Sequence, residues 1–225
     1  MYRFLVKNIH SSCRIKISKS TITNFTMMLA GIVLMGFCIS LFRISDFGTD
    51  PFSCMNLGIS ACLGWSFGNW QLLLNALLFG IVLWNSKSCI GIGTIINMTC
   101  VGYTADFFTT KLQLLFGSTE LLSFGLRACI MLIAVILTAL AVAMYMTAEM
   151  GIAPYDAIGV IIENKTNNKV PLRYSRVITD VLCVTIGILT GSTVGLGTVI
   201  TAFFTGPLVQ FMKDKILLRL RIFSI

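Results

Sequence analysis

The sequence predicts an all-α membrane protein, a polytopic transmembrane bundle of about six spans built from two homologous repeats, each with a short helix that begins at a proline. Three observations predict this fold class. The chain is 56% hydrophobic and only 12% charged, whereas soluble domains carry about 25% charged residues. Its apolar runs do not alternate with polar residues as barrel strands do, so helices must satisfy the backbone in lipid. Two short motifs also occur twice, about 103 residues apart.

The clearer of the two repeated motifs is Gly-x-Gly-Thr. Residues 90–95 read Ile-Gly-Ile-Gly-Thr-Ile, and residues 194–199 read Val-Gly-Leu-Gly-Thr-Val, each with a further glycine eight residues after the threonine. Upstream, the Gly-Thr-Asp-Pro-Phe run around Pro51 has a looser counterpart in the Gly-Ile-Ala-Pro-Tyr-Asp run around Pro154. Duplicated halves with matched proline or glycine elements are typical of transporter folds.

Six apolar stretches approach the ~20 residues that a spanning helix needs, and they lie at residues 25–45, 69–86, 90–110, 125–147, 174–191 and 194–212. Two further apolar segments, residues 51–64 and 154–162, are shorter and begin near the repeated prolines. Helices of these lengths would cover only about 13–21 Å, against a hydrocarbon core roughly 30 Å thick. Each short helix is therefore expected to end partway through the membrane or to lie along its surface.

The repeat divides the chain into a basic tail, two transmembrane repeats and a second basic tail, at residues 1–24, 25–112, 113–212 and 213–225. Three spans per repeat place the second repeat upside down relative to the first, whereas four spans per repeat would make the two parallel. With six spans and cytoplasmic termini, Lys87 and the basic cluster at 165–176 fall on the cytoplasmic side, as the positive-inside rule expects. Eight spans remain the alternative.

Five ionisable residues are candidates for a substrate site, because charges at membrane depth are costly and usually face a partner or a cavity; they are Asp50, Asp106, Asp156, Arg176 and Asp180. Arg176 and Asp180 have the spacing of a helical salt bridge, which either anchors a helix end or forms part of a site. Asp106 either reaches the interface or takes a proton or cation. Asp50 and Asp156 are expected to cap the short helices or to hold a substrate group, and carboxylates there favour a cation or zwitterion over an anion.

The Gly-x-Gly-Thr motifs are expected to serve helix packing or a hinge; their residues are Gly91, Gly93, Thr94, Gly195, Gly197 and Thr198. A nucleotide loop would need a preceding strand or a phosphate-binding lysine, and the sequence has neither beside these glycines. Glycines at membrane depth commonly let helices approach closely. Pro51 and Pro154 are expected to start the two short helices.

Other classes of function find little support in the composition. His10 is the single histidine and lies in a basic tail, so Ser-His or Cys-His catalysis is excluded and no enzyme is expected. The eight cysteines form no C-x-x-C pair, so neither a metal site nor a cofactor is expected. The net charge of +8 sits mainly beside the apolar runs, where it favours contact with lipid headgroups over nucleic acid.

These motifs, in this order, resemble the YczE/YyaS/YitT family of bacterial integral membrane proteins, with the likeness running from about Thr26 to Met212. The resemblance implies a multi-pass protein of the bacterial inner membrane and no established activity. The YitT branch often carries an extra soluble carboxyl-terminal domain, which this chain is not expected to have. The glycine pattern is also similar to the substrate-binding subunits of energy-coupling vitamin transporters.

Two functions are consistent with these features. The first is a permease or substrate-binding membrane subunit for a small molecule or ion. The second is a non-transporting scaffold or regulatory subunit that docks an acidic partner through its cytoplasmic basic loops. The expected partners are the lipid bilayer and, beyond it, a further subunit or a second copy of the chain.

Overall fold

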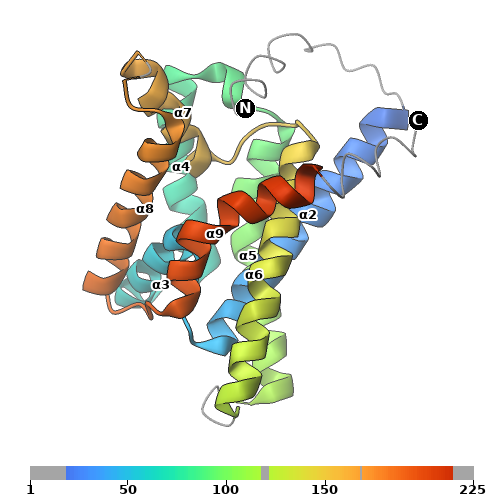
Figure 1. Ribbon diagram of the computed structural model, residues 1–225, viewed down its shortest axis with the longest axis vertical. Helices are drawn as coiled ribbons and strands as arrows, with labels where there is room; N and C mark the ends of the chain where they lie inside the picture. Colours follow the sequence, from blue (N-terminus) through green and yellow to red (C-terminus); the bar gives the residue numbers. More distant parts are fainter. Residues whose placement is uncertain (1–18, 118–121, 168, 215–225) are drawn as a thin grey trace.

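The computed structural model describes residues 19–117, 122–167 and 169–214, and in this part of the chain it contains eight α-helices, one 3-10 helix and no strand (Figure 1). The six longer helices are α2 (Lys19–Ser45), α4 (Phe67–Asn85), α5 (Ile92–Phe116), α6 (Phe124–Thr147), α8 (Leu172–Leu189) and α9 (Leu196–Met212). The shorter ones are α3 (Pro51–Leu63), η1 (Lys87–Cys89) and α7 (Pro154–Lys165). The all-α fold class is therefore confirmed.

Each predicted span coincides with a long helix, and each predicted short segment coincides with α3 or α7. Within the described ranges, three helices are both long and apolar enough to cross a membrane, and they contain Thr21–Ser45, Phe67–Asn85 and Phe124–Thr147. The basic tails predicted at residues 1–24 and 213–225 lie mostly outside the described residues.

The long helices alternate in direction along the chain. In Figure 1, α2, α5 and α8 run downwards, whereas α4, α6 and α9 run upwards. The short helices α3 and α7 each stand between two long helices of opposite direction. The connection that leads into α3 lies toward the lower part of the molecule, and the connection into α7 lies toward the upper part.

Helix α2 forms the centre of the bundle because it packs against both α5 and α6. Two glycines allow this close approach: a Cβ at Gly31 would lie 2.9 Å from the Ala141 carbonyl oxygen, and one at Gly36 would lie 2.0 Å from Thr104 Oγ1. The largest buried apolar cluster joins these helices to α4, and includes Met28, Ile32, Phe67, Val101 and Tyr145.

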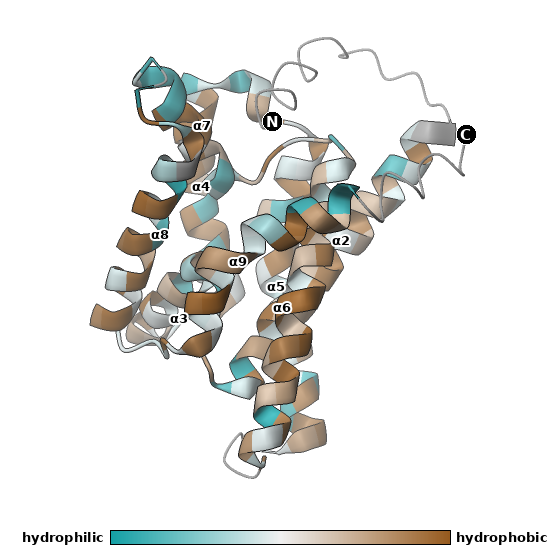
Figure 2. Cartoon of the chain, in the orientation of Figure 1, coloured by the Kyte–Doolittle hydropathy of each residue, from teal (hydrophilic) through white to brown (hydrophobic). Residues whose placement is uncertain are grey.

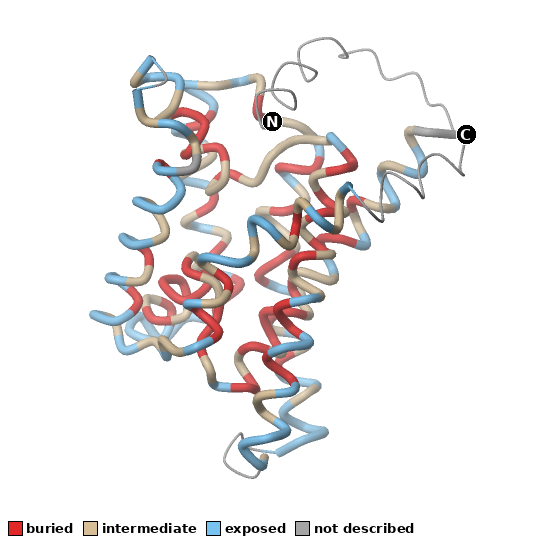
Figure 3. The backbone as a smooth tube through the Cα atoms, in the orientation of Figure 1, coloured by how far each residue is buried: buried red, intermediate tan, exposed pale blue. Residues whose placement is uncertain are grey.

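The outer surface of the bundle is strongly apolar. Figure 2 shows hydrophobic residues along the outward sides of α6, α8 and α9, and Figure 3 shows that buried residues face inward. On α8 several aliphatic side chains are about half exposed, among them Val177, Ile178, Val181 and Leu182. Soluble monomers rarely leave so large an apolar surface uncovered, so this surface is suited to lipid.

The sequence explains how the short helices begin. The Asp50 carboxylate accepts a hydrogen bond from the Ser53 backbone N–H at 3.0 Å, and Pro51 occupies the first turn, so the predicted cap on α3 is confirmed. Helix α7 also has its proline, Pro154, in the first turn, with Asp156 close behind. Helix α3 ends at Gly64, whose φ of 65° is the left-handed conformation that glycine adopts easily.

Candidate functional site

Each Gly-x-Gly-Thr motif contacts the chain segment, here called a connector, that leads into one of the two short helices. The Gly93 N–H donates to the Met150 carbonyl oxygen at 2.8 Å, and the Gly197 N–H donates to the Phe47 carbonyl oxygen at the same distance. Met150 precedes α7 and Phe47 precedes α3. The two motifs therefore make matching hydrogen bonds to the connectors that precede the two short helices, and Gly93 also lies close to Met28 of α2.

Glycine is required at these contacts because the connector backbone lies against it. A Cβ at Gly91 would lie 2.1 Å from the Met150 carbonyl oxygen, and one at Gly195 would lie 2.5 Å from that of Phe47. Both distances are too short for any side chain to be accommodated without moving the backbone.

The two connectors also share an uncommon backbone conformation. Asp46 has a φ of 53° and Glu149, at the matching position, has a φ of 54°. The glycines two residues later, Gly48 and Gly151, have φ values of 86° and 120°. Left-handed conformations are disfavoured for side-chain-bearing residues, so the same strained turn is built twice.

The two threonines of the motifs differ in their hydrogen bonding. Thr94 Oγ1 donates to the Ile152 carbonyl oxygen at 2.9 Å, which fixes the connector into α7. Thr198 is equally buried, but its Oγ1 has no hydrogen-bond partner among the described residues. The contact between the second motif and the first connector is therefore the less complete of the two.

The first turns of the two short helices meet through an aromatic pair. The rings of Phe52 and Tyr155 are stacked with their centroids 4.3 Å apart. The Tyr155 hydroxyl donates to Asp180 Oδ1 at 2.6 Å and lies 3.6 Å from Cys183 Sγ. Because Asp180 is on α8, this contact links α3, α7 and α8 at one point.

Four of the five predicted ionisable site residues lie around this junction. Arg176 Nη2 lies 3.0 Å from Asp156 Oδ1, so α8 is also tied to α7 by an ion pair. Arg176 and Asp180 are one helical turn apart on α8, and Asp50 caps α3 two residues before Phe52. Asp50, Asp156, Arg176 and Asp180 are hereafter called the junction cluster, which combines three carboxylates with one guanidinium.

The fifth predicted residue, Asp106, belongs to a different group. Its carboxylate lies 3.0 Å from Arg43 Nη1 and accepts a hydrogen bond from the Gly68 N–H at 2.8 Å. It thus ties α5 to the end of α2 and to the first turn of α4, which is a structural arrangement. No group of three His, Cys, Asp or Glu side chains in the described ranges is placed to hold a metal ion.

Residue spacing did not point to Phe52 and Tyr155 as site residues. Each stands directly after a repeated proline, and this shared position was the one available signal. The spacing did indicate a partnership between Arg176 and Asp180, but the close ion pair with Asp156 comes from a separate helix.

Comparison with known proteins identifies the family of this chain. Residues 22–214 match the model of a family described as a family of unknown function, DUF6198. The chain belongs to this family. The DUF6198 chain is 26% identical over 194 residues to the uncharacterized membrane protein YczE of Bacillus subtilis (strain 168), covering 84% of this chain and 85% of YczE.

Two further relatives are similar at the same level. The uncharacterized protein YyaS of the same B. subtilis strain is 27% identical over 184 residues, covering 80% of the DUF6198 chain and 87% of YyaS. An uncharacterized protein of Haemophilus influenzae is 27% identical over 191 residues, covering 85% and 84% of the two chains. No solved structure matches the chain. The resemblance to YczE and YyaS is thus confirmed, and with its apolar helices the DUF6198 protein is a membrane protein.

Proposed function

We propose that this protein is a permease, or the substrate-binding membrane subunit of one, for a small cation or zwitterion. The observation that carries the proposal is the junction cluster, where Asp50, Asp156, Arg176 and Asp180 gather beside the first turns of α3 and α7. Groups of this kind at membrane depth mark substrate or ion pathways. Short helices that begin at such a point are the usual binding elements of transporters with duplicated halves.

Two homologous halves in inverted orientation are part of the proposal. The reciprocal contacts at Gly93 and Gly197, and the equal φ values at Asp46 and Glu149, support it. So does the alternation of the six long helices in Figure 1, in which α2 and α6 run in opposite directions. Helices α3 and α7 then stop short of crossing, and the protein has six spans.

The charge distribution supports cytoplasmic termini in a bacterial inner membrane. Lys87, Lys165 and Lys169 are exposed. They lie in or next to the connections from α4 to α5 and from α7 to α8, which are near the upper end of the molecule in Figure 1. At the other end, Arg43 and Arg127 are paired with carboxylates. Uncompensated basic residues gather on the cytoplasmic side of membrane proteins.

The proposal is tested by ligand-dependent stability. The purified protein in detergent is heated with sodium, potassium, choline, putrescine or glycine betaine, and the Tm is compared with and without each compound. A ligand that stabilises the wild type by several degrees is expected to lose that effect in Asp180→Asn, while Asp106→Asn retains it. If every ligand leaves the Tm of the wild type unchanged, or if both variants respond alike, the junction cluster is not the binding site.

A scaffold function is the second candidate, and exposed Lys165 and Lys169 at one end of the bundle support it. Such a loop would dock an acidic protein or anionic lipid. Under this alternative a partner subunit should co-purify in mild detergent and be lost in a Lys165→Gln/Lys169→Gln variant. The scaffold alternative requires nothing of Asp180, so Asp180→Asn separates the two candidates.

A further inference from the structure

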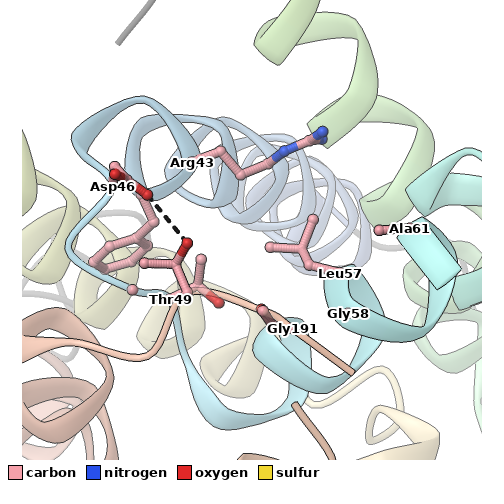
Figure 4. Close-up of a pocket in the computed structure, with 11 residues that line it drawn as sticks. Arg43, Asp46, Thr49, Leu57, Gly58, Ala61 and Gly191 are labelled. Carbon is pink, nitrogen blue, oxygen red and sulfur yellow. Dashed lines mark hydrogen bonds between the residues drawn. The ribbon is translucent and has the colours of Figure 1, made fainter. Parts of the chain in front are cut away.

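A pocket of about 220 Å³ opens between the end of α2, one face of α3 and the connection from α8 to α9 (Figure 4). Its lining includes both charged and apolar side chains: Arg43, Asp46, Thr193, Phe42, Leu57 and Ala61. Thr49 also lines it, and the next residue, Asp50, belongs to the junction cluster. The pocket and the cluster therefore lie next to each other along the connector into α3.

The two charged side chains in the pocket have opposite sign and lie apart from each other in Figure 4. Arg43 donates to Asp106 Oδ1 through one guanidinium nitrogen, Nη1. A guanidinium has five N–H donors, so Arg43 can bind a second carboxylate while it keeps this bond. The guanidinium carbon also lies 5.9 Å from the centre of the Phe67 ring, which helps to fix its position.

Asp46 is likewise held in place, and its carboxylate can accept further hydrogen bonds. Its Oδ2 lies 3.0 Å from Arg127 Nη2, and its Oδ1 accepts a hydrogen bond from Thr193 Oγ1 at 3.1 Å. A carboxylate accepts about four hydrogen bonds, and the Asp46 side chain remains 48% exposed. An ammonium group can therefore approach it without breaking either contact.

The apolar side chains and the volume of the pocket limit the size of the ligand. Phe42, Leu57 and Ala61 offer hydrocarbon, and Gly58 and Gly191 bring backbone close to the space. Pockets for drug-sized ligands are usually about 300–1,000 Å³, so this one suits a molecule of only a few carbon atoms.

We propose that this pocket binds a small zwitterion, with its carboxylate on Arg43, its ammonium on Asp46 and its short hydrocarbon chain against Leu57 and Ala61. The inference goes beyond the proposed function, because binding at the pocket does not require transport or the junction cluster. A singly charged ligand would satisfy one of the two groups and leave the other without a partner. The pocket should therefore prefer a zwitterion to the matching cation or anion.

The probes are ω-amino acids of increasing length, namely glycine, β-alanine, γ-aminobutyrate and 5-aminovalerate, with butyrate and butylammonium as singly charged controls. Binding to the detergent-purified protein is measured by calorimetry and by Tm. At least one ω-amino acid is expected to bind tenfold or more tightly than both controls. Equal binding of butyrate or butylammonium, or no binding by any ω-amino acid, would overturn the proposal.

Location is tested by filling the pocket without changing charge. Ala61→Phe places a ring in the space and should reduce affinity at least tenfold, whereas Leu63→Phe, at an exposed position on the same helix outside the lining, should bind normally. Should Ala61→Phe fail to fold, Asp46→Asn provides the same test, since it removes the charge that binds the ammonium. Wild-type affinity in the folded pocket variant would place the ligand elsewhere.

The pocket proposal and the junction-cluster proposal can be tested separately. Asp180→Asn should bind the ω-amino acid as the wild type does, because Asp180 does not line the pocket. Loss of binding in Asp180→Asn together with normal binding in Ala61→Phe would assign the ligand to the junction cluster and overturn the pocket proposal while supporting the proposed function.

Discussion

The Phe52 ring is stacked on the Tyr155 ring, with 22° between the ring planes. These residues follow the prolines that open the two short helices, so the pair joins equivalent positions of α3 and α7. Tyr155 differs from Phe52 by a hydroxyl, and this hydroxyl binds Asp180. The contact between the short helices thus has a symmetric part, the stacking, and an asymmetric part, the hydrogen bond.

Because the rings are stacked, the effects of substituting Phe52 and Tyr155 on the free energy of unfolding are expected to depend on each other. Phe52→Ala and Tyr155→Ala should each lower the free energy of unfolding. The double variant should lower it by about 0.5–1.5 kcal/mol less than the sum of the two single losses, which is the usual contribution of an aromatic pair. Apparent unfolding free energies in detergent and denaturant provide the measurement. Strict additivity would mean that the rings do not support each other.

Tyr155→Phe separates the two parts of this contact. Tyr155→Phe keeps the ring and removes the hydroxyl that donates to Asp180. The coupling energy between residues 52 and 155 should therefore be the same whether residue 155 is tyrosine or phenylalanine. Phe204→Ala, at an exposed ring on α9, is the control that should show no coupling to either residue.

The two motif threonines should respond in opposite ways to the same substitution. Thr94→Val removes a hydrogen bond to the Ile152 carbonyl, and should cost about 1 kcal/mol, within the range for hydrogen bonds in membrane proteins. Thr198→Val replaces a buried hydroxyl without a partner in the described part of the chain by a methyl group of similar shape, and should be neutral or stabilising. Apparent Tm values of the two variants, measured side by side, provide the check. Equal losses would show that both hydroxyls have partners in the membrane.

Much of the helical arrangement could be predicted from the sequence, because a spanning helix leaves a long apolar run. Asp50 was predictable as a cap, since an acidic residue before proline is a local signal. Local signals also place the ends of α3, where proline and Gly64 stand at the two boundaries.

The contacts between the halves could not be predicted in the same way. The carbonyl groups of Phe47 and Met150 are backbone atoms that any residue carries, so nothing in their side chains marks them as partners of the glycine motifs. The ion pair of Arg176 with Asp156 joins residues on different helices, and helical spacing reports only neighbours within one helix. The pocket near Arg43 depends on how three distant segments come together, and no motif marks it.

The motif glycines are expected to tolerate no side chain. Gly91→Ala and Gly195→Ala each place a methyl group within 2.5 Å or less of a connector carbonyl oxygen, and overpacking of this kind costs about 1–3 kcal/mol or more. Gly80→Ala is the matched control, because a Cβ at Gly80 meets nothing within 4 Å. That variant should be neutral or more stable by about 0.5–1 kcal/mol. Thermal unfolding in detergent tests all three, and a tolerated Gly91→Ala would contradict the close contact.

The proposed six-span arrangement predicts on which side of the membrane each loop lies. The eight native cysteines are first replaced by serine or alanine. A single cysteine is then introduced by Lys111→Cys or by Lys165→Cys, and both positions are exposed. A membrane-impermeant maleimide is expected to label Lys111→Cys in intact cells, because the loop after α5 would face outwards, and to label Lys165→Cys only after permeabilisation.

A third position separates six spans from eight, because short helices that crossed the membrane would move Lys87 outside and Lys111 inside. Lys87→Cys should therefore behave like Lys165→Cys if α3 and α7 stop partway, and labelling of Lys87→Cys in intact cells would mean that α3 crosses. The Tm of each variant shows whether it is folded. All three positions are exposed, so each substitution should change the free energy of unfolding by less than about 0.5 kcal/mol. Labelling of Lys111→Cys and Lys165→Cys from the same side would contradict the proposed inverted orientation of the halves.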